Sequence, residues 1–353
     1  MESIQAKYYS YGEIGSQPEA WSKIIPLVLG QAGAIRDIFK GVKEVIFAGC
    51  GSGLNVSMAG APVMQAKAQI STRAVPAVEI YKFSDSVLNK KRKTLAILSS
   101  RSGKTTEVVT AMHHLHDQGI STLGVTCTDG SPLAVESTLA LVLSPVVEQA
   151  VITTRSLTGM ILSTQLITAI AAQDEVYLDE LRQLPDICAS HMNDFLDLGQ
   201  DIGQRTDLSR FAFLANGPLF GAAHESQLKV KEMVLLPSDC YPALDFRHGP
   251  QSNVNEQMLV TVFFSDSASE EEARLLKDMK ALGGVTWAVC DQAVREVTKE
   301  SDYLLEVRSG LGEYARGILY LPAIHYMAYY RAIVSGLNPD EPHNLAYWID
   351  TSH

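Results

Sequence analysis

Residues 45–53, VIFAGCGSG, decide the fold of this chain, because they join a continuous apolar strand to a turn of small residues that opens a helix. The arrangement recurs at residues 94–107, where TLAIL leads into SSRSGKTTE. Such a turn leaves backbone N–H groups unpaired at a helix start, and these groups together with the helix dipole favour a dianion. The hydroxyl groups of Ser100, Ser102 and Thr105 add donors. The two turns therefore predict a phosphate-binding site.

The pattern of strands and turns repeats about 165 residues later in the chain. FAFLANGPLFGAA from 211 echoes the first segment, MLVTVFFSDS from 258 echoes TLAILSSRS, and GVTWAVC from 284 echoes STLGVTC from 121. In each copy, short β-branched strands alternate with segments of helical periodicity, which is typical of parallel α/β units with right-handed crossovers. The repeat predicts two doubly wound α/β domains.

The expected domain boundaries follow from this repeat. We predict a helical N-terminal arm over residues 1–40, domains over 41–195 and 196–336, and a C-terminal tail over 337–353 that closes over the site. In open parallel sheets a ligand binds outside the carboxyl ends of the strands, where both turns of the first copy fall. In the second copy, NGPLFG lacks the hydroxyls of GCGSG, and SDSASEEE replaces the basic residues of SSRSGKTTE with acids. The second domain is therefore predicted not to hold a phosphate in the same manner.

Composition narrows the class of protein. The chain has 353 residues, 46% of them hydrophobic, and a formal net charge of −11. The acidic balance, without a long Lys/Arg cluster, argues against nucleic acid as the main partner. The start lacks the pattern of a signal peptide, and no later stretch is apolar enough to span a bilayer, so we expect a cytoplasmic protein with no membrane partner.

The cysteine and histidine residues give no metal or disulfide pattern. The five cysteines are odd in number and widely spaced, which favours reduced thiols. The run HHLH at 113–116 cannot present all three imidazoles on one helix face, and no acidic or Cys partner accompanies it. We expect no metal ion, and the sequence indicates no cofactor.

The segment ESQLKVKEM contains the strongest candidates for catalysis. Glu225, Lys229 and Glu232 are spaced i, i+4 and i+7, so they share one helix face on which a Glu–Lys pair can form beside a second carboxylate. Such spacing is also common on a solvated ion-pair face. The helix follows the strand FAFLA directly, so its first turns lie near the carboxyl edge of the sheet. This position favours a catalytic network.

The segment FRHGP places His248 in a loop fixed by Gly249 and Pro250. A lone histidine in a loop is more often a surface residue than a catalyst. Imidazole nevertheless titrates near neutral pH and can act as a general acid. His248 is therefore a second catalytic candidate.

Taken together, these motifs resemble the tandem sugar isomerase (SIS) domain family. This family includes the isomerase domain of glucosamine-6-phosphate synthase, glucosamine-6-phosphate deaminases, the AgaS-like isomerase/deaminase group and fructosamine-6-phosphate deglycases. The resemblance extends over about residues 40–347 and rests on GCGSG, SSRSGKTTE, EQAVITTRS, ESQLKVKEM, FRHGP and NPDEPHNLA in family order. It implies two flavodoxin-like SIS domains. It also implies that the protein binds a carbohydrate derivative, namely a small-molecule sugar phosphate.

The resemblance also implies roles for individual residues. Glu232 would move a proton between C1 and C2 of the open-chain sugar, with Glu225 and Lys229 in support. His248 would reach the site of a neighbouring subunit, which makes a homodimer or higher oligomer the expected assembly. The residues implied to hold the phosphate are Cys50, Gly51, Ser52, Ser100, Arg101, Ser102 and Thr105, and those implied to line the sugar are Val151 and Thr153.

One departure from the family pattern limits the chemistry. Tyr347 stands where the synthase and some deaminases carry a Lys that can form an imine. A phenol cannot replace an amine nucleophile, so Schiff-base formation at this position is excluded. A glutaminase segment with a leading Cys is also missing, so ammonia-channelling synthesis is not expected.

The sequence therefore predicts an enzyme of amino sugar metabolism that converts a 2-amino-2-deoxyhexose 6-phosphate to a ketose 6-phosphate and ammonia. Two alternatives remain open within the same chemistry, a fructosamine-6-phosphate deglycase and a ketose/aldose isomerase of the tagatose-6-phosphate type. An alternative of another class is a sugar-phosphate sensor without turnover. A sensor has no need of an acid and a base, so Glu232 and His248 favour the enzyme.

Overall fold

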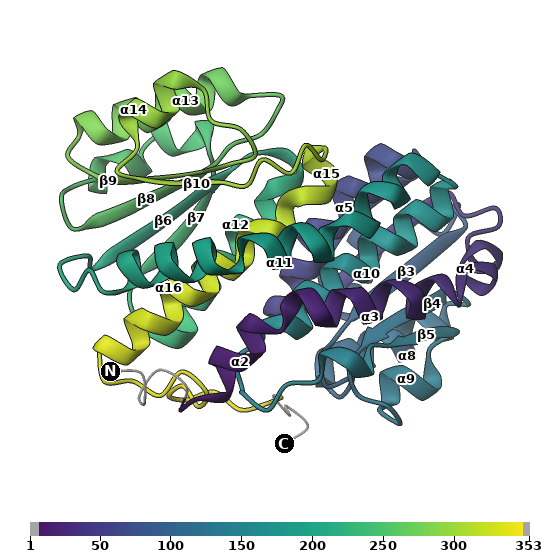
Figure 1. Cartoon of the computed structure of the whole chain (residues 1–353). Helices are drawn as coiled ribbons and strands as arrows, with labels where there is room; N and C mark the ends of the chain where they lie inside the picture. The colour runs from purple at the N-terminus through teal and green to yellow at the C-terminus, as the bar shows by residue number, and fades with distance from the viewer. Residues whose placement is uncertain (1–6, 349–353) are drawn as a thin grey trace. The chain divides into compact units, whose positions relative to one another are not determined.

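The computed structural model describes residues 7–348, which form two compact units. The first unit comprises Ser16–Pro185 and the described residues from Leu345 onward. The second comprises Asp186–Asn344 and the described residues up to Gly15. Each unit is built on one five-stranded sheet, blue in the first and green in the second (Figure 1). The residues of the predicted N-terminal arm are thus divided between the two units.

The first unit has the sheet order β2-β1-β3-β4-β5, with every pair parallel. Its strands are β1 Glu44–Gly49, β2 Ser71–Pro76, β3 Thr94–Ser99, β4 Ser121–Thr126 and β5 Leu139–Val142. Its helices are α3 Gln17–Leu29, α4 Ala32–Ile38, α5 Ser52–Ala68, α6 Ala77–Lys82, α7 Ser84–Val87, α8 Thr106–Asp117, α9 Pro132–Glu136 and α10 Arg155–Ala172, followed by α11 Glu175–Gly203, which continues into the second unit.

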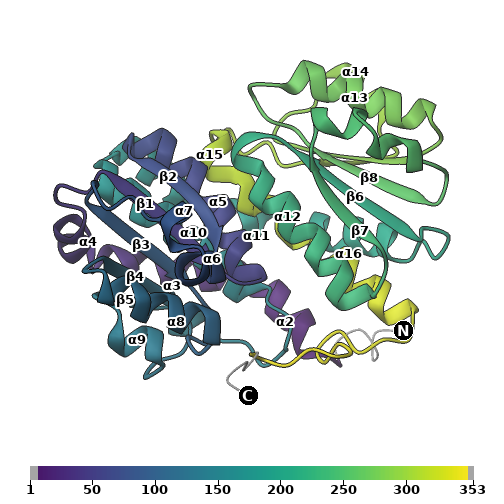
Figure 2. The ribbon, with the colours of Figure 1, turned by 180° about the vertical axis from the view of Figure 1, so that it is seen from behind.

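The second unit repeats this topology. Its sheet order, β7-β6-β8-β9-β10 with all pairs parallel, matches that of the first sheet strand for strand (Figure 2). The strands are β6 Arg210–Ala215, β7 Ser238–Pro242, β8 Met258–Phe263, β9 Val285–Cys290 and β10 Tyr303–Glu306. The helices are α2 Tyr9–Gly15, α12 Phe220–Lys229, α13 Ser269–Ala281, α14 Arg295–Glu300, α15 Glu313–Arg316 and α16 Leu321–Val334. The predicted pair of doubly wound parallel sheets is confirmed.

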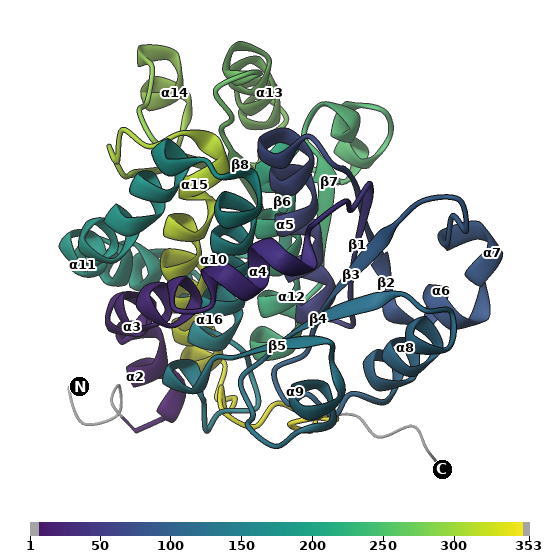
Figure 3. The same ribbon diagram turned by 90° about the vertical axis from the view of Figure 1, so that its right-hand side faces the viewer.

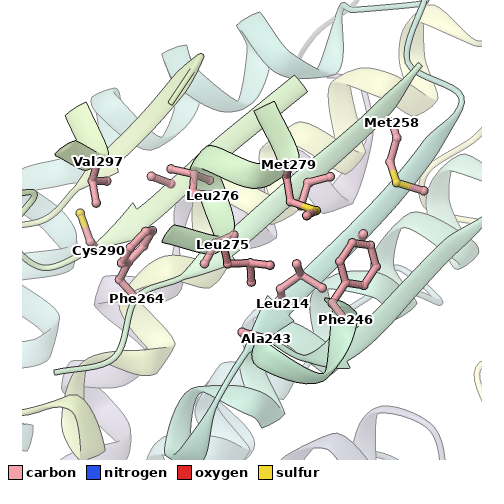
Figure 4. Close-up of a cluster of buried hydrophobic side chains, with 14 residues drawn as sticks. Leu214, Ala243, Phe246, Met258, Phe264, Leu275, Leu276, Met279, Cys290 and Val297 are labelled. Carbon is pink, nitrogen blue, oxygen red and sulfur yellow. The ribbon is translucent and has the colours of Figure 1, made fainter. Parts of the chain in front are cut away.

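The core of each unit follows from strand periodicity, because alternate residues of a strand point to opposite faces. In the first unit, Ile46 and Ala48 of β1 pack with α6, α8 and α9. On the other face, Phe47 lies against Gly60 of α5, which also approaches α10. Figure 3 shows these two groups of helices on opposite sides of the sheet. In the second unit, the face that carries Leu214 packs against α13 and α14 (Figure 4). Burial on both faces explains why the central strands are continuously apolar.

Each doubly wound sheet has a switch point where the strand order reverses, and ligands of such folds bind there. In the first sheet the switch point lies between β1 and β3, whose last residues Gly49 and Ser99 are register partners. The small-residue turn and the hydroxyl-rich turn therefore leave the sheet side by side. In the second sheet the switch point lies between β6 and β8.

Residues early and late in the described part of the chain meet within the second unit. In the second unit, the carboxylate of Asp340 accepts hydrogen bonds from the backbone N–H groups of Tyr9 (2.7 Å) and Ser10 (2.9 Å). Within residues 7–348, none of the helices has the length and apolar composition that crossing a bilayer requires.

Candidate functional site

The turn after β1 brings backbone unusually close to the neighbouring strand. Gly51 has φ +51°, a left-handed conformation that favours glycine. A Cβ on Gly53 would lie 2.6 Å from the carbonyl oxygen of Ser99, so only glycine lets α5 begin against the end of β3. The GCGSG pattern thus places the N-terminus of α5 at the switch point.

The turn after β3 gathers hydroxyl groups. Ser100 Oγ lies 2.9 Å from Thr105 Oγ1 and accepts from the N–H of Gly103 (3.1 Å), and Ser102 Oγ accepts from the N–H of Lys104 (3.2 Å). Within residues 7–348, the backbone N–H groups of Arg101 and Ser102 have no protein acceptor. Hydroxyls and open N–H groups are the donors that a phosphate oxygen needs.

The third segment of this site is the loop that precedes α10. Thr153 Oγ1 donates to Ser52 Oγ at 3.0 Å, which joins the loop to the first turn. Val151 and Thr153 are both half-buried. The first unit thereby brings together the nine residues expected to hold the phosphate and sugar, and each lies on one of these three segments.

Cys50 is half-buried in the first turn, and its thiol is free, as are the other four. Burial raises the pKa of Cys50 to about 11, and the negative charge of Glu107 adds to the effect. The thiolate is the nucleophilic form of cysteine. Cys50 is therefore a small structural residue of the turn.

We expect Cys50 to alkylate slowly, because a pKa of about 11 leaves roughly 0.1% thiolate at pH 8. Glu107→Gln removes a negative charge near the thiol, so it should lower the pKa of Cys50 and speed its alkylation. Peptide mass spectrometry after iodoacetamide treatment at several pH values measures both. Cys240, whose thiol pKa burial raises to about 12, is the internal reference. An unchanged Cys50 pH profile in the variant would contradict this electrostatic coupling.

The side chain of Arg101 is buried and engaged by protein groups. Its guanidinium donates to the carbonyl oxygens of Ala150 (3.1 Å), Val151 (2.7 Å) and Tyr347 (3.1 Å). It also lies 3.6 Å from the buried carboxylate of Glu148. What Arg101 leaves open toward a ligand is its backbone N–H, and its side chain connects the turn after β3 to two other segments.

Tyr347 completes this cluster from the C-terminal segment of the first unit. Its ring centroid lies 3.8 Å from the Arg101 guanidinium carbon, a cation–π contact, and its phenol donates to the carbonyl oxygen of Glu148 (3.2 Å). The ammonium nitrogen of Lys104 lies 5.3 Å from the ring centroid of Trp348, a second cation–π contact. The tail thus packs on the hydroxyl-rich turn through two aromatic rings.

Arg101→Met is expected to release the C-terminal segment, because it removes the hydrogen bond to Tyr347 and the cation on its ring. Chymotrypsin cleaves after Tyr and Trp, so cleavage at Tyr347 and Trp348 should become several-fold faster, measured by mass spectrometry of the released peptide. Arg92→Met, at an exposed position of the same unit, is the control. Equal cleavage rates for both variants would show that Arg101 does not hold the tail.

The second unit contains the cluster predicted from ESQLKVKEM, with Glu225 and Lys229 on α12 and Glu232 in the turn that follows. Lys229 Nζ lies 3.1 Å from Glu225 Oε1 and donates to Glu232 Oε2 at 2.6 Å. The side chains of Lys229 and Glu225 are fully buried, whereas that of Glu232 is 20% exposed. The cluster is therefore a buried network with one accessible carboxylate. The alternative, an ion pair on a solvated helix face, does not apply.

The charge of Lys229 is fixed by its neighbours. Burial acts to lower the pKa of Lys229, but the Glu225 and Glu232 carboxylates outweigh burial and raise the pKa above its ordinary value. Lys229 therefore stays an ammonium ion and cannot act as an amine nucleophile. The fully buried His325 on α16 has a pKa well below the usual one, owing to burial and the nearby Lys229 charge. His325 is thus neutral.

The helix changes its winding at the accessible carboxylate. The α-helical turns end at Lys229, and Val230–Val234 form a π turn before Leu235 adopts a left-handed φ of +58°. The sequence spacing predicted a regular helix through Glu232, so this feature is new. Single π turns are rare and occur frequently at functional sites.

His248 is exposed, in a loop between the 3₁₀ turns Leu244–Arg247 and Pro250–Asn253. Gly249 follows with φ +137°, a conformation reserved for glycine. His248 belongs to the same unit as Glu232. Two residues that sequence reasoning missed are Glu148, which lies within EQAVITTRS but carries no catalytic signal, and His325, in an apolar helix.

The comparisons with known proteins agree with this fold and these motifs. The SIS domain signature matches residues 38–169 and 206–331. The chain belongs to the SIS domain family. The two matches cover the two sheets, so the internal repeat is a pair of SIS domains.

Curated relatives include two glutamine–fructose-6-phosphate aminotransferases (isomerizing). The protein from Pyrobaculum aerophilum is 26% identical over 348 residues, which is 96% of this chain and 57% of the relative. The protein from Chlamydia caviae is 26% identical over 356 residues, 96% of this chain and 58% of the relative. This SIS chain therefore spans less than two thirds of the length of these relatives.

Solved structures include a glucosamine-6-phosphate deaminase from Thermotoga maritima, with a TM-score of 0.76, 27% identity, and coverage of 97% of this chain and 99% of that one. The tagatose-6-phosphate ketose/aldose isomerase from Escherichia coli has a TM-score of 0.87 at 22% identity and covers 98% of both chains. The second likeness shows the fold alone.

Proposed function

We propose that this SIS chain is a phosphosugar deaminase/isomerase that converts a 2-amino-2-deoxyhexose 6-phosphate to a ketose 6-phosphate and ammonia. The observation that carries the proposal is the buried Lys229, held between Glu225 and the accessible Glu232 of the π turn. Perturbed, buried ionisable groups beside one accessible carboxylate are typical of acid–base sites. The glucosamine-6-phosphate deaminase structure at 27% identity supports the same reaction class.

The phosphate has its binding groups in the first SIS domain. Open N–H groups of Arg101 and Ser102, the hydroxyls of Ser100 and Thr105, and the N-terminus of α5 at Ser52 supply donors without a metal ion. The side chain of Arg101 positions the loop before α10 through its carbonyl contacts. In this assignment, Arg101 contacts phosphate through its backbone only.

Proton transfer belongs to Glu232. After ring opening, its carboxylate takes the proton from C2 of the open-chain amino sugar and returns it to C1, which leaves an imine at C2. Water then adds to the imine carbon, and ammonia departs to give the ketose phosphate. Lys229 remains protonated, and its donated hydrogen bond holds the Glu232 carboxylate in place.

Ring opening is assigned to His248, whose exposed loop can serve the site of a second copy of the chain. Imidazolium donates a proton to the ring oxygen as the C1 hydroxyl is deprotonated. The assembly proposed is a homodimer or higher oligomer. Mixing Glu232→Gln with His248→Asn protein should then restore part of the activity, because one site of a mixed dimer keeps both groups. No recovery in mixed dimers verified by mass would rule out a shared site.

The test of the reaction is ammonia release from glucosamine 6-phosphate and galactosamine 6-phosphate, with ketose 6-phosphate measured in the same samples. Stoichiometric release of both products from either sugar is the expected result. Absence of ammonia, with turnover of a fructosamine phosphate or tagatose 6-phosphate instead, would replace the deaminase with a deglycase or a ketose/aldose isomerase. Phosphosugar binding without any turnover would favour the alternative of a non-catalytic sugar-phosphate sensor.

A further inference from the structure

The second SIS domain has a turn that corresponds residue for residue to the hydroxyl-rich turn. Ser100 N donates to Val125 O in the first domain, and Phe264 N donates to Val289 O in the second. The same shift along the chain relates the buried apolar positions of α8 to those of α13. It also pairs Arg101 with Ser265, Ser102 with Asp266 and Val108 with Glu272.

The two copies treat equivalent backbone N–H groups in opposite ways. Those of Arg101 and Ser102 have no acceptor within residues 7–348. In the second domain, Ser265 N donates to Glu272 Oε2 (2.7 Å), and Asp266 N donates to Glu313 Oε2 (2.7 Å). Two carboxylates therefore occupy the N–H groups that the first domain leaves open.

Glu272, which accepts the Ser265 N–H, stands at a position that is apolar and buried in the first domain. Val108 is 1% exposed in the first domain, and Glu272 is fully buried in the second. The Glu272 carboxylate also accepts from Ser265 Oγ (3.1 Å) and from Asn216 Nδ2 (2.8 Å), and Asn216 directly follows β6. A buried carboxylate is costly unless it is fully hydrogen-bonded. This one bonds both strand ends of the switch point, as a bound anion would.

Space for a ligand remains beside this turn, and the guanidinium that lines it is engaged by protein groups. A cavity of about 420 Å³ is lined by Ser265, Asp266, Asp291 and Arg316, among others. Arg316 is the basic residue among its described lining residues, and its guanidinium is bound by both oxygens of Asp266, by Leu311 O and by Tyr320 Oη. Protein acceptors thus already engage the N–H groups of Ser265 and Asp266 and the guanidinium of Arg316 that line this cavity.

We propose that the second SIS domain keeps an anion cradle at its switch point but fills it with its own Glu272 and Glu313 carboxylates, so that phosphate binds only in the first domain. This proposal rests on the proposed function only for phosphate binding at the turn after β3, the first cradle; the turn after β8 is the second cradle. The closure of the second cradle stands on the Ser265 and Asp266 contacts. Replacing Glu272 with the valine of the first copy should free the N–H of Ser265, and removing the Glu313 carboxylate should free that of Asp266.

Hydrogen exchange of the wild-type chain, with inorganic phosphate against KCl of equal ionic strength, tests the closed state. Exchange in residues 100–105 should slow with phosphate, and exchange in 264–268 should not change. Phosphate-dependent slowing in 264–268 would overturn the inference. An unresponsive 100–105 segment would instead count against the proposed function, and the second turn would still be tested on its own.

The double variant Glu272→Val, Glu313→Leu, which removes both acceptors from the Ser265 and Asp266 N–H groups, tests the latent cradle by the same measurement. Residues 264–268 should gain phosphate-dependent slowing, whereas Glu271→Gln, at a half-exposed position of the same helix, should behave as wild type. Loss of the Glu272 carboxylate leaves the Ser265 N–H and the Asn216 amide without their acceptor, which costs stability, so circular dichroism first establishes that the variant is folded. A folded double variant with no phosphate response in this segment would refute the latent cradle. If the variant does not fold, the wild-type comparison decides.

Discussion

Glu232→Gln is expected to lower kcat for amino-sugar phosphate turnover about 10²- to 10⁴-fold, the range for loss of a general base. The amide keeps the shape of the side chain and can still accept the Lys229 hydrogen bond that the carboxylate accepts at 2.6 Å. It cannot take up a proton. Substrate affinity should therefore change little, so the loss falls on kcat and on kcat/KM alike.

The measurement is steady-state ammonia release together with direct titration of the substrate into the variant. Glu271→Gln, which removes a half-exposed carboxylate in the same unit, controls for a general effect of removing negative charge. Turnover close to that of the wild type would remove Glu232 from the mechanism. Loss of binding together with turnover would make it a structural residue.

Lys229→Met is expected to cost about 3–5 kcal/mol in the free energy of unfolding of the second unit, because it leaves a fully buried Glu225 carboxylate without its cation. Methionine fills a similar volume, so packing contributes little to the loss. The folded-state pKa of Lys229 is raised, so its stabilising contribution is present below the unfolded pKa near 10.5 and is lost as pH rises through the folded pKa.

Urea unfolding followed by fluorescence of Trp287 measures this cost, because Trp287 is fully buried in the second sheet. All variants also carry Trp21→Phe and Trp348→Phe, which remove the tryptophan fluorescence of the first unit. The double variant Glu225→Gln, Lys229→Met is the matched control and should recover part of the stability, since it removes the unpaired charge as well. A single variant as stable as the wild type would show that Glu225 is protonated or otherwise compensated.

The fold was predictable because it follows from periodic patterns. Continuous apolar strands such as Val45–Ala48 occur only where both faces of a sheet are covered, and a repeat of about 165 residues requires the second sheet to copy the first. The glycines of GCGSG fixed where α5 begins. Family membership was predicted from six motifs in family order, and the residues expected to hold the phosphate and sugar lie on three neighbouring segments.

Other features could not be predicted because they depend on contacts that sequence spacing does not contain. The π turn at Val230–Val234 has no signature in the apolar pattern. The engagement of Arg101 by Ala150, Val151 and Tyr347 joins residues up to 246 positions apart. The division of the chain into units has the same origin, since Asp340 bonds Ser10 across 330 positions. The roles of Glu232 and His248 stay predictions.

The late position of Tyr347 has a consequence for folding during synthesis. Arg101 leaves the ribosome 246 residues before the tyrosine whose carbonyl and ring it contacts. At the usual translation speed, this interval lasts about 12–50 s. Of the groups that contact the Arg101 side chain, Glu148 and the carbonyls before α10 are synthesised well before Tyr347. The hydroxyl-rich turn therefore reaches its final packing only when synthesis has passed Tyr347, so a nascent chain stalled before that point should expose an incomplete cradle to chaperones and proteases.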